Sequence, residues 1–257
     1  MNRFFEAIGR VCLRIMEEFG RFFTMFGRVA GWTVRPPYDI RELLRQMVRV
    51  GVDSIPVVFL TTLFTGMVMA LQTYNGFARF HAENFVGSVV ALSLTRELSP
   101  VLTALMVTGR VGSAMAAELG TMRVTEQIDA LTSLGTEPVQ YLMVPRVLAA
   151  IAMLPMLVIM GDVVGIYGGY AVAVQLMGAN PVAYLDNSFQ FLHIKDDVVS
   201  GIIKAAVFGL IFSLIACVKG FYTTGGAEGV GRSTTRAVVS GSLSVLVTDF
   251  FLTKLLY

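Results

Sequence analysis

The sequence predicts an all-α integral membrane protein, with an amphipathic N-terminal helix at the membrane interface, about five transmembrane helices and a cytoplasmic helix between the second and third. Hydrophobic residues make up 55% of the 257 residues and charged residues only 15%, whereas roughly a quarter of a soluble domain is charged. Five apolar stretches reach the roughly 20 residues that a membrane span needs. The connections are too short for a soluble domain, so we expect a single domain over 1–257, with interfacial and juxtamembrane helices in 1–50 and a transmembrane core in 51–257.

The N-terminal amphipathic helix is predicted for residues 2–31. Apolar residues recur there at steps of three and four, which gives one stripe at about 100° per residue. The stripe consists of Phe4, Ile8, Val11, Ile15, Phe19, Phe22, Phe26 and Val29. Five arginines lie on a flank roughly 100° away; they are Arg3, Arg10, Arg14, Arg21 and Arg28. This pattern favours a helix lying in the membrane interface, where arginine reaches lipid phosphates, over a soluble helix with a solvated face.

The five spans are expected at residues 54–74, 85–117, 147–177, 198–218 and 237–257. The second is long enough to be tilted, broken at Pro100 or preceded by a re-entrant piece. The third is also overlong and contains Pro155. Before the fifth span, Gly225-Gly226 and Gly229-x-Gly231 look like a flexible loop.

Basic residues predict the orientation of these spans. Nine arginines and no lysine lie in the first fifty residues. The connections at 75–84, 118–146, 178–197 and 219–236 then carry one, two, one and three basic residues. Because basic residues concentrate on the cytoplasmic side, we expect a cytoplasmic N-terminus and five crossings.

Six ionisable residues lie at or within the apolar stretches: Arg96, Glu97, Arg110, Asp162, Lys204 and Asp249. Each costs about 2.5–3.5 kcal/mol to insert, so such residues usually face a partner or a water-filled cavity. We expect Lys204 and Asp249 to form a structural charge pair. Arg96 and Glu97 point about 100° apart on a helix, so they cannot simply neutralise each other.

Several function classes lack their motifs. The sequence has no G-x-x-x-x-G-K-[ST] loop for ATP. Cys12 and Cys217 form neither a disulfide framework nor a metal-ligand spacing, and His81 and His193 are far from any cysteine cluster. We therefore expect no metal site, no catalytic residues and no nucleic-acid partner.

The polar part of the chain carries a more specific signal. Its segments are Arg96-Glu97-Leu98, Gly112-Ser113-Ala114, Ala117-Glu118-Leu119-Gly120, Glu126-Gln127-Ile128-Asp129-Ala130-Leu131 and Pro145-Arg146, with Gly66-Met67-Val68 and Gly231-Arg232-Ser233 in flanking regions. This set resembles the MlaE (YrbE-type) permease family, the membrane subunit of lipid ABC transporters that work with MCE proteins. The resemblance covers nearly the whole chain from about residue 40. Ser99 stands where the family usually has glycine.

The resemblance implies a multi-pass protein of the bacterial inner membrane that moves glycerophospholipid between that membrane and a periplasmic route, and so maintains outer-membrane lipid asymmetry. It implies a homodimer with a cytoplasmic ABC ATPase subunit and a periplasmic MCE-domain subunit; a small cytoplasmic STAS-type subunit is a further partner. ATP and Mg would be bound by the ATPase, so no cofactor is expected in this chain.

Two sets of site residues follow. The resemblance makes the segment from Glu126 to Gly135 the coupling helix that docks on the ATPase. Its residues are Glu126, Gln127, Ile128, Asp129, Leu131 and Gly135, with Ile128, Leu131 and Leu134 on one apolar face. Near the outer ends of the first two spans, we expect Met69, Gln72, Tyr74, Arg96, Glu97 and Leu98 to line a lipid cavity. The alternative for Arg96 and Glu97 is that they only brace helices within one subunit.

Two rival functions are a secondary transporter or channel without an ATPase partner, and a membrane-embedded enzyme. A secondary transporter is expected to show inverted repeats, and this sequence shows no internal repeat.

Overall fold

The computed structural model describes residues 2–35 and 39–256, without the side chains of 2–12, 14, 15 and 194. Over these residues the secondary structure is helical and contains no strand. Five helical segments are long and apolar enough to cross a membrane. The predicted all-α membrane fold is therefore confirmed.

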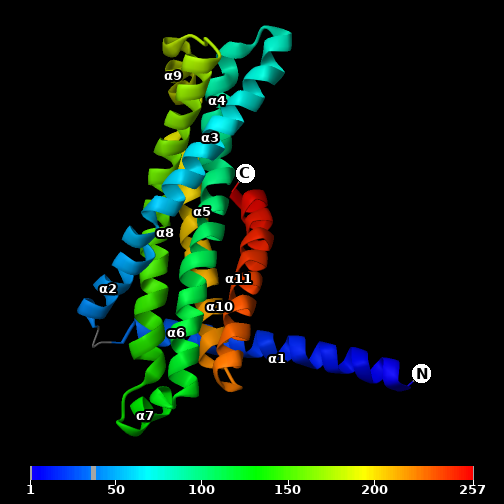
Figure 1. Cartoon of the computed structure of the whole chain (residues 1–257), viewed down its shortest axis with the longest axis vertical. Helices are drawn as coiled ribbons and strands as arrows, with labels where there is room; N and C mark the ends of the chain where they lie inside the picture. The colour runs from blue at the N-terminus through cyan, green and yellow to red at the C-terminus, as the bar shows by residue number, and fades with distance from the viewer. Residues whose placement is uncertain (1, 36–38, 257) are drawn as a thin grey trace.

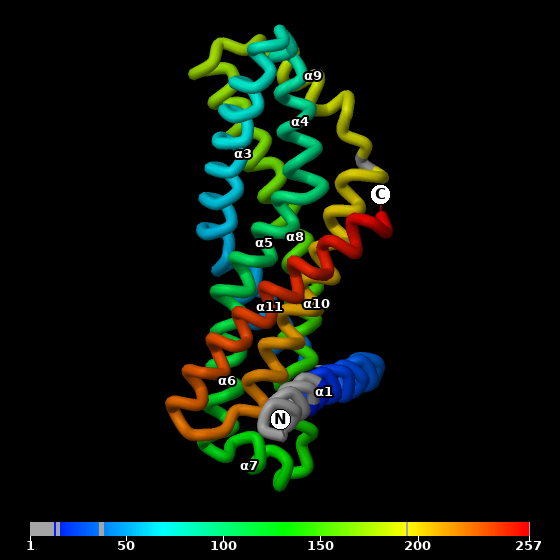
Figure 2. Tube along the Cα trace, turned by 90° about the vertical axis from the view of Figure 1, so that its right-hand side faces the viewer, coloured from blue at the N-terminus to red at the C-terminus, as the bar shows by residue number. Residues whose placement is uncertain are grey.

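The N-terminal helix α1 (Asn2–Thr33) lies across the bundle near the end that carries the short helix α7 (Gln127–Ser133). Figure 1 shows that α1 runs out to one side of the bundle, and Figure 2 shows it at the same end. Met25 and Val29 are buried against the bundle, whereas Phe19 and Phe23 are exposed. An exposed aromatic face on a helix that crosses the bundle axis suits a position in the membrane interface.

The bundle is formed by helices that follow α1 in the chain. They are α2 (Ile40–Val50), α3 (Ile55–Phe77), α4 (Val86–Ser93), α5 (Ser99–Val107), α6 (Ser113–Val124), α8 (Val144–Tyr170), α10 (Val199–Phe221) and α11 (Gly226–Leu256). Below, the two ends of the bundle are called the α7 end and the α9 end, after the short helices α7 and α9 (Pro181–Gln190). Helix α8 packs against α2, α3 and α10 and lies within the bundle.

The second span is one helical segment from Glu83 to Val124, interrupted by two π-helical turns. Its 42 residues extend about 63 Å, about twice the 30 Å hydrocarbon thickness. The first π turn, η4 (Leu94–Leu98), ends two residues before Pro100. A proline lacks the N–H that bonds the carbonyl four residues earlier and clashes with that carbonyl. The wider π turn accommodates it, so the segment is not broken at Pro100.

One expectation about the connections is wrong. Gly229 and Gly231 lie within α11, and the turn before it comprises only Tyr222–Gly225. A Cβ on Gly229 would lie 1.9 Å from the Thr224 carbonyl oxygen, so glycine permits this tight start. The stretch 178–197 also contains α9, where the Asn180 side chain accepts hydrogen bonds from Val182 N and Ala183 N as an N-cap.

Glycines bring α3 and α8 into contact. A Cβ on Gly66 would lie 1.9 Å from the carbonyl oxygen of Gly165, on the facing helix. Real Cβ atoms do not approach backbone so closely, so α3 and α8 would have to separate. A Cβ on Gly76, on the same helix, would meet no neighbouring atom within 4 Å.

We therefore expect Gly66→Ala to lower the free energy of unfolding by about 1–3 kcal/mol, the usual cost of overpacking. Gly76→Ala is the matched control and should be neutral or slightly stabilising. Thermal unfolding of the purified chain in detergent, followed by Trp32 fluorescence, checks this. Equal midpoints for the two variants would contradict the close contact.

Candidate functional site

A buried ion cluster joins three helical segments between the middle of the bundle and the α9 end. Lys204, on α10, is completely buried. Its Nζ lies 2.8 Å from Glu97 Oε2 in η4 and 3.3 Å from Asp249 Oδ1 on α11. It also donates a hydrogen bond to the Thr253 hydroxyl at 2.7 Å. One ammonium thus serves two carboxylates from different segments.

Pro100 helps to build this cluster. Because it has no backbone N–H, the carbonyl of Arg96, four residues earlier, has no partner from Pro100. Lys204 Nζ donates a hydrogen bond to this carbonyl oxygen at 3.0 Å. The proline therefore creates an acceptor in the middle of a span, and the buried lysine satisfies it.

Arg96 makes a separate ion pair. Its guanidinium lies 2.6 Å from Oδ1 of Asp197, whose side chain is completely buried. Asp197 Oδ2 accepts a hydrogen bond from the backbone N–H of His193 at 2.7 Å. The pair ties the second span to η8 (Ile194–Val198), the turn that leads into α10. Arg96 and Glu97 are adjacent in the sequence, yet they pair with different residues near and on α10: Arg96 with Asp197 and Glu97 with Lys204.

The predicted cavity residues divide into two groups. Arg96 and Glu97 brace helices, yet their side chains remain 39% and 36% exposed. Met69, Tyr74 and Leu98 pack against the smaller hydrophobic cluster near the α9 end, and Gln72 is exposed on α3. Within one chain, Arg96 and Glu97 thus form ion pairs that join helical segments. Their partners, Asp197 and Lys204, were not predicted.

The predicted coupling segment folds as α7, a seven-residue helix. Glu126 precedes it with a positive φ of 61°, and Gly135 follows it with a φ of 76°. Arg123, at the end of α6, pairs with Asp129 at 2.6 Å. Figure 1 shows α7 at the tip of the bundle, beyond the long helices.

The orientation of α7 corrects one expectation. Ile128 is only 2% exposed and belongs to the main hydrophobic core, whereas Leu134 is 80% exposed. The helix ends at Ser133, so its periodicity does not carry Leu134 onto the face of Ile128. Leu131 is half-buried against the core. Ile128 therefore anchors α7, and the surface open to another protein contains Gln127, Asp129, Ser133, Leu134 and Gly135.

A second ion network involves α6, the helix that precedes α7. Glu118, on α6, pairs with Arg146 at 2.9 Å and with Arg49 at 2.8 Å. These contacts join α6 to α8 and α2, and the Arg146 side chain is almost fully buried. The network was not predicted, although Glu118 and Arg146 both lie in the motifs that carry the family resemblance.

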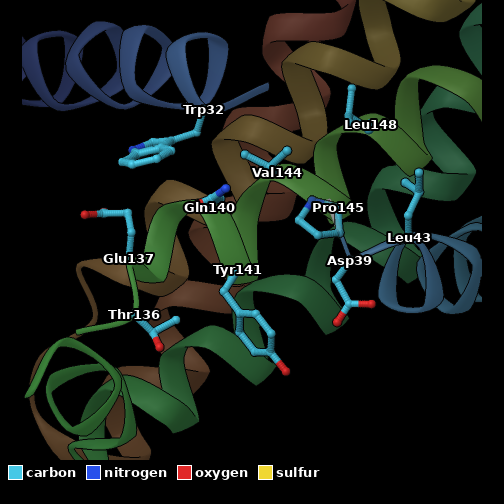
Figure 3. Close-up of a pocket in the computed structure, with 10 residues that line it drawn as sticks. All are labelled: Trp32, Asp39, Leu43, Thr136, Glu137, Gln140, Tyr141, Val144, Pro145 and Leu148. Atoms are coloured by element: carbon cyan, nitrogen blue, oxygen red, sulfur yellow. The ribbon is translucent and has the colours of Figure 1, made fainter. Parts of the chain in front are cut away.

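A pocket of about 270 Å³ lies between the end of α1, the start of α2 and the first turns leading into α8. Figure 3 shows Trp32 and Glu137 on one side of it and Asp39 on the other, with Tyr141 between them. Glu137 is paired with Arg28 at 2.6 Å. Ligand pockets have about 300–1,000 Å³, so this space is too small for a phospholipid. Among the described residues no histidine, cysteine, aspartate and glutamate group could hold a metal ion.

Comparison with known proteins decides the family. Residues 43–255 match the family model described as Permease MlaE. The chain belongs to the MlaE permease family.

Relatives of this MlaE-family chain match along nearly its whole length. It is 48% identical over 253 residues to a probable ABC transporter permease protein of Rickettsia typhi, covering 98% of this chain and 97% of that one. It is 37% identical to the intermembrane phospholipid transport system permease protein MlaE of Haemophilus influenzae, covering 99% and 97%. The Arabidopsis thaliana chloroplastic protein TRIGALACTOSYLDIACYLGLYCEROL 1 is 42% identical over 84% of this chain and 62% of its own length. The MlaE-family chain is thus a multi-pass membrane permease of the ABC type.

Proposed function

We propose that this chain is the membrane subunit of an ATP-driven transporter that moves glycerophospholipid between the bacterial inner membrane and a periplasmic route of MCE proteins. The full-length similarity to a permease named for intermembrane phospholipid transport carries this proposal. The transport would maintain the lipid asymmetry of the outer membrane. ATP and Mg belong to a partner ATPase, and this chain contributes the path and the coupling surface.

The α7 end is the proposed contact with the ATPase. A short helix projects there beyond the bundle, is anchored in the core by Ile128, and presents Leu134 to solvent. An apolar side chain on an exposed, rigidly held helix suits insertion into a groove of another protein. The nine arginines of residues 1–50 support a cytoplasmic position for this end.

The proposed lipid path lies toward the α9 end, between the subunits of a homodimer. Helices α3 and α11 are the least covered spans, with 28% and 11% of their apolar windows buried. Met69, Gln72, Tyr74 and Leu98 would line the outer part of the cavity. The partly exposed Arg96 and Glu97 would add polarity for a headgroup while they brace the wall.

Gln72 offers a test of this path because it is exposed and makes no hydrogen bond within the described residues. We expect Gln72→Trp to leave complex assembly intact and to reduce phospholipid transfer about tenfold, equivalent to about 1.4 kcal/mol of crowding. Val57→Trp, at an equally accessible site near the other end of α3, is the control and should retain transfer. If assembled Gln72→Trp transfers phospholipid at the wild-type rate, the outer half of α3 does not line the path.

Co-purification tests the assembly. The chain, expressed with the other subunits from its own cell, should be isolated with an ABC ATPase, an MCE-domain protein and the small STAS-type subunit, and should contain two permease copies. Isolation of a lone permease that moves its substrate without an ATPase would instead support a secondary transporter or channel.

A further inference from the structure

A second groove, distinct from the proposed path, lies between α1, α10 and α11 in the half of the bundle nearest α7. It encloses about 400 Å³. Ile211, Ile215 and Val218 of α10 line it, facing a row of small polar residues on α11. Phe19 and Phe22 of α1 also line it, and the side of the groove next to α1 is called its mouth below. The groove is thus apolar on one wall and hydroxyl-bearing on the other.

Three cationic side chains converge at the mouth of this groove: Arg21, Lys219 and Arg236. Lys219 pairs with Glu18 at 2.7 Å. Arg21 pairs with Glu17, and its guanidinium also lies 4.8 Å from the centre of the Tyr222 ring. Arg236 is exposed, and no acidic side chain of the described residues pairs with it. The mouth therefore carries more positive than negative charge and offers one guanidinium to an anion.

Hydroxyl groups deeper in the groove also lack partners. Ser240, Ser244 and Thr248 make no hydrogen bond within the described part of the chain, whereas Thr253 on the same helix donates to the Asp249 carbonyl. A hydroxyl that faces hydrocarbon without a partner is costly. An occupant with acceptor oxygens close to Ser240 would remove part of that cost.

The dimensions of the groove match one leaflet. From Arg236 to Thr248, α11 rises about 18 Å, close to half of the roughly 30 Å hydrocarbon thickness. Arg236 and Lys219, which lies in the last turn of α10, both line the groove, and α1 packs against α10. A phospholipid would fill the groove with its phosphate at the mouth, its ester oxygens near Ser240 and one acyl chain along Ile215 and Ile211.

We propose that this groove binds an anionic glycerophospholipid from the leaflet in which α1 lies, with Arg236 contacting its phosphate. The proposal rests on the proposed function for one point only, the orientation of the chain, which makes this leaflet the cytoplasmic one. The site is separate from the Lys204 cluster and would hold a lipid on the side opposite to the periplasmic route. The permease would then have contact with phospholipid in both leaflets.

Photolabelling tests the proposal on the full chain in phosphatidylcholine vesicles that contain phosphatidylglycerol with a diazirine on one acyl chain. Neither ATPase nor ATP is added, so the result does not depend on transport. We expect labelled peptides within residues 211–218 of the wild type. Arg236→Ala should reduce this labelling about fivefold, which corresponds to about 1 kcal/mol, and Ser244→Trp should abolish it by filling the groove.

Arg232→Ala is the matched control, because Arg232 lies one turn earlier on α11, is exposed and does not line the groove. It should be labelled like the wild type, and all variants should share the wild-type unfolding midpoint. Equal labelling of Arg236→Ala and wild type would overturn the proposal. Efficient cross-linking of Ser240→Cys to a second copy of the chain would also overturn it, since another subunit would then occupy the groove.

Discussion

Replacing Lys204 with methionine should destabilise the permease by about 3–5 kcal/mol, because it leaves Glu97 and Asp249 without their shared cation inside the bundle. The carbonyl oxygen of Arg96 loses its donor as well. We expect a large fall in the midpoint of thermal unfolding and a loss of monodisperse protein on size-exclusion chromatography in detergent.

The charge explanation has a specific control. Adding Glu97→Gln and Asp249→Asn to Lys204→Met removes both unpaired carboxylates and should recover most of the lost stability. Lys195→Met, at an exposed lysine, should have no effect. If the triple variant is as unstable as Lys204→Met alone, packing of the lysine stem, and not charge pairing, would explain the cluster.

On α7, we expect two aspartate substitutions to act in different ways. Leu134→Asp should leave the unfolding midpoint unchanged, because the side chain is 80% exposed. It should weaken the ATPase contact by about 2 kcal/mol or more, roughly thirtyfold in affinity. Ile128→Asp should destabilise the permease itself by about 2–5 kcal/mol, because that side chain is buried in the core.

Quantitative pull-down of the ATPase, together with thermal unfolding of the permease alone, separates these effects. Val34→Asp is the control, since Val34 is 78% exposed but lies beyond α1 and not on α7. Full ATPase recovery with Leu134→Asp would contradict the proposed contact at Leu134.

The membrane architecture was predictable because long apolar stretches carry a strong and local signal. The five spans occur near their expected positions, and α1 covers the predicted amphipathic stretch. The start of α11 was missed because glycine has a low intrinsic helix propensity. There, glycine at 229 is required by its close approach to the Thr224 carbonyl in the turn before α11, which helix propensity does not describe.

The residue types of the candidate site and the Lys204–Asp249 pair were predictable, but the partners of Arg96 and Glu97 were not. The free-energy cost of placing a charged side chain in hydrocarbon singled out Arg96, Glu97, Lys204 and Asp249. Their pairing depends on the π turn before Pro100, which changes the direction of side chains after it. A uniform 100° helical repeat cannot reveal this. Helix α9, in contrast, had a readable start signal in Asn180-Pro181.

The central claim is that this permease moves phospholipid only when an ATPase drives it. The most direct measurement is the transfer of a fluorescent phospholipid from vesicles containing the permease, the proposed ATPase and the proposed MCE-domain subunit to an acceptor membrane. We expect transfer to require both ATP hydrolysis and the permease, and Leu134→Asp to abolish it. Equal transfer by the permease alone, without nucleotide, would contradict it.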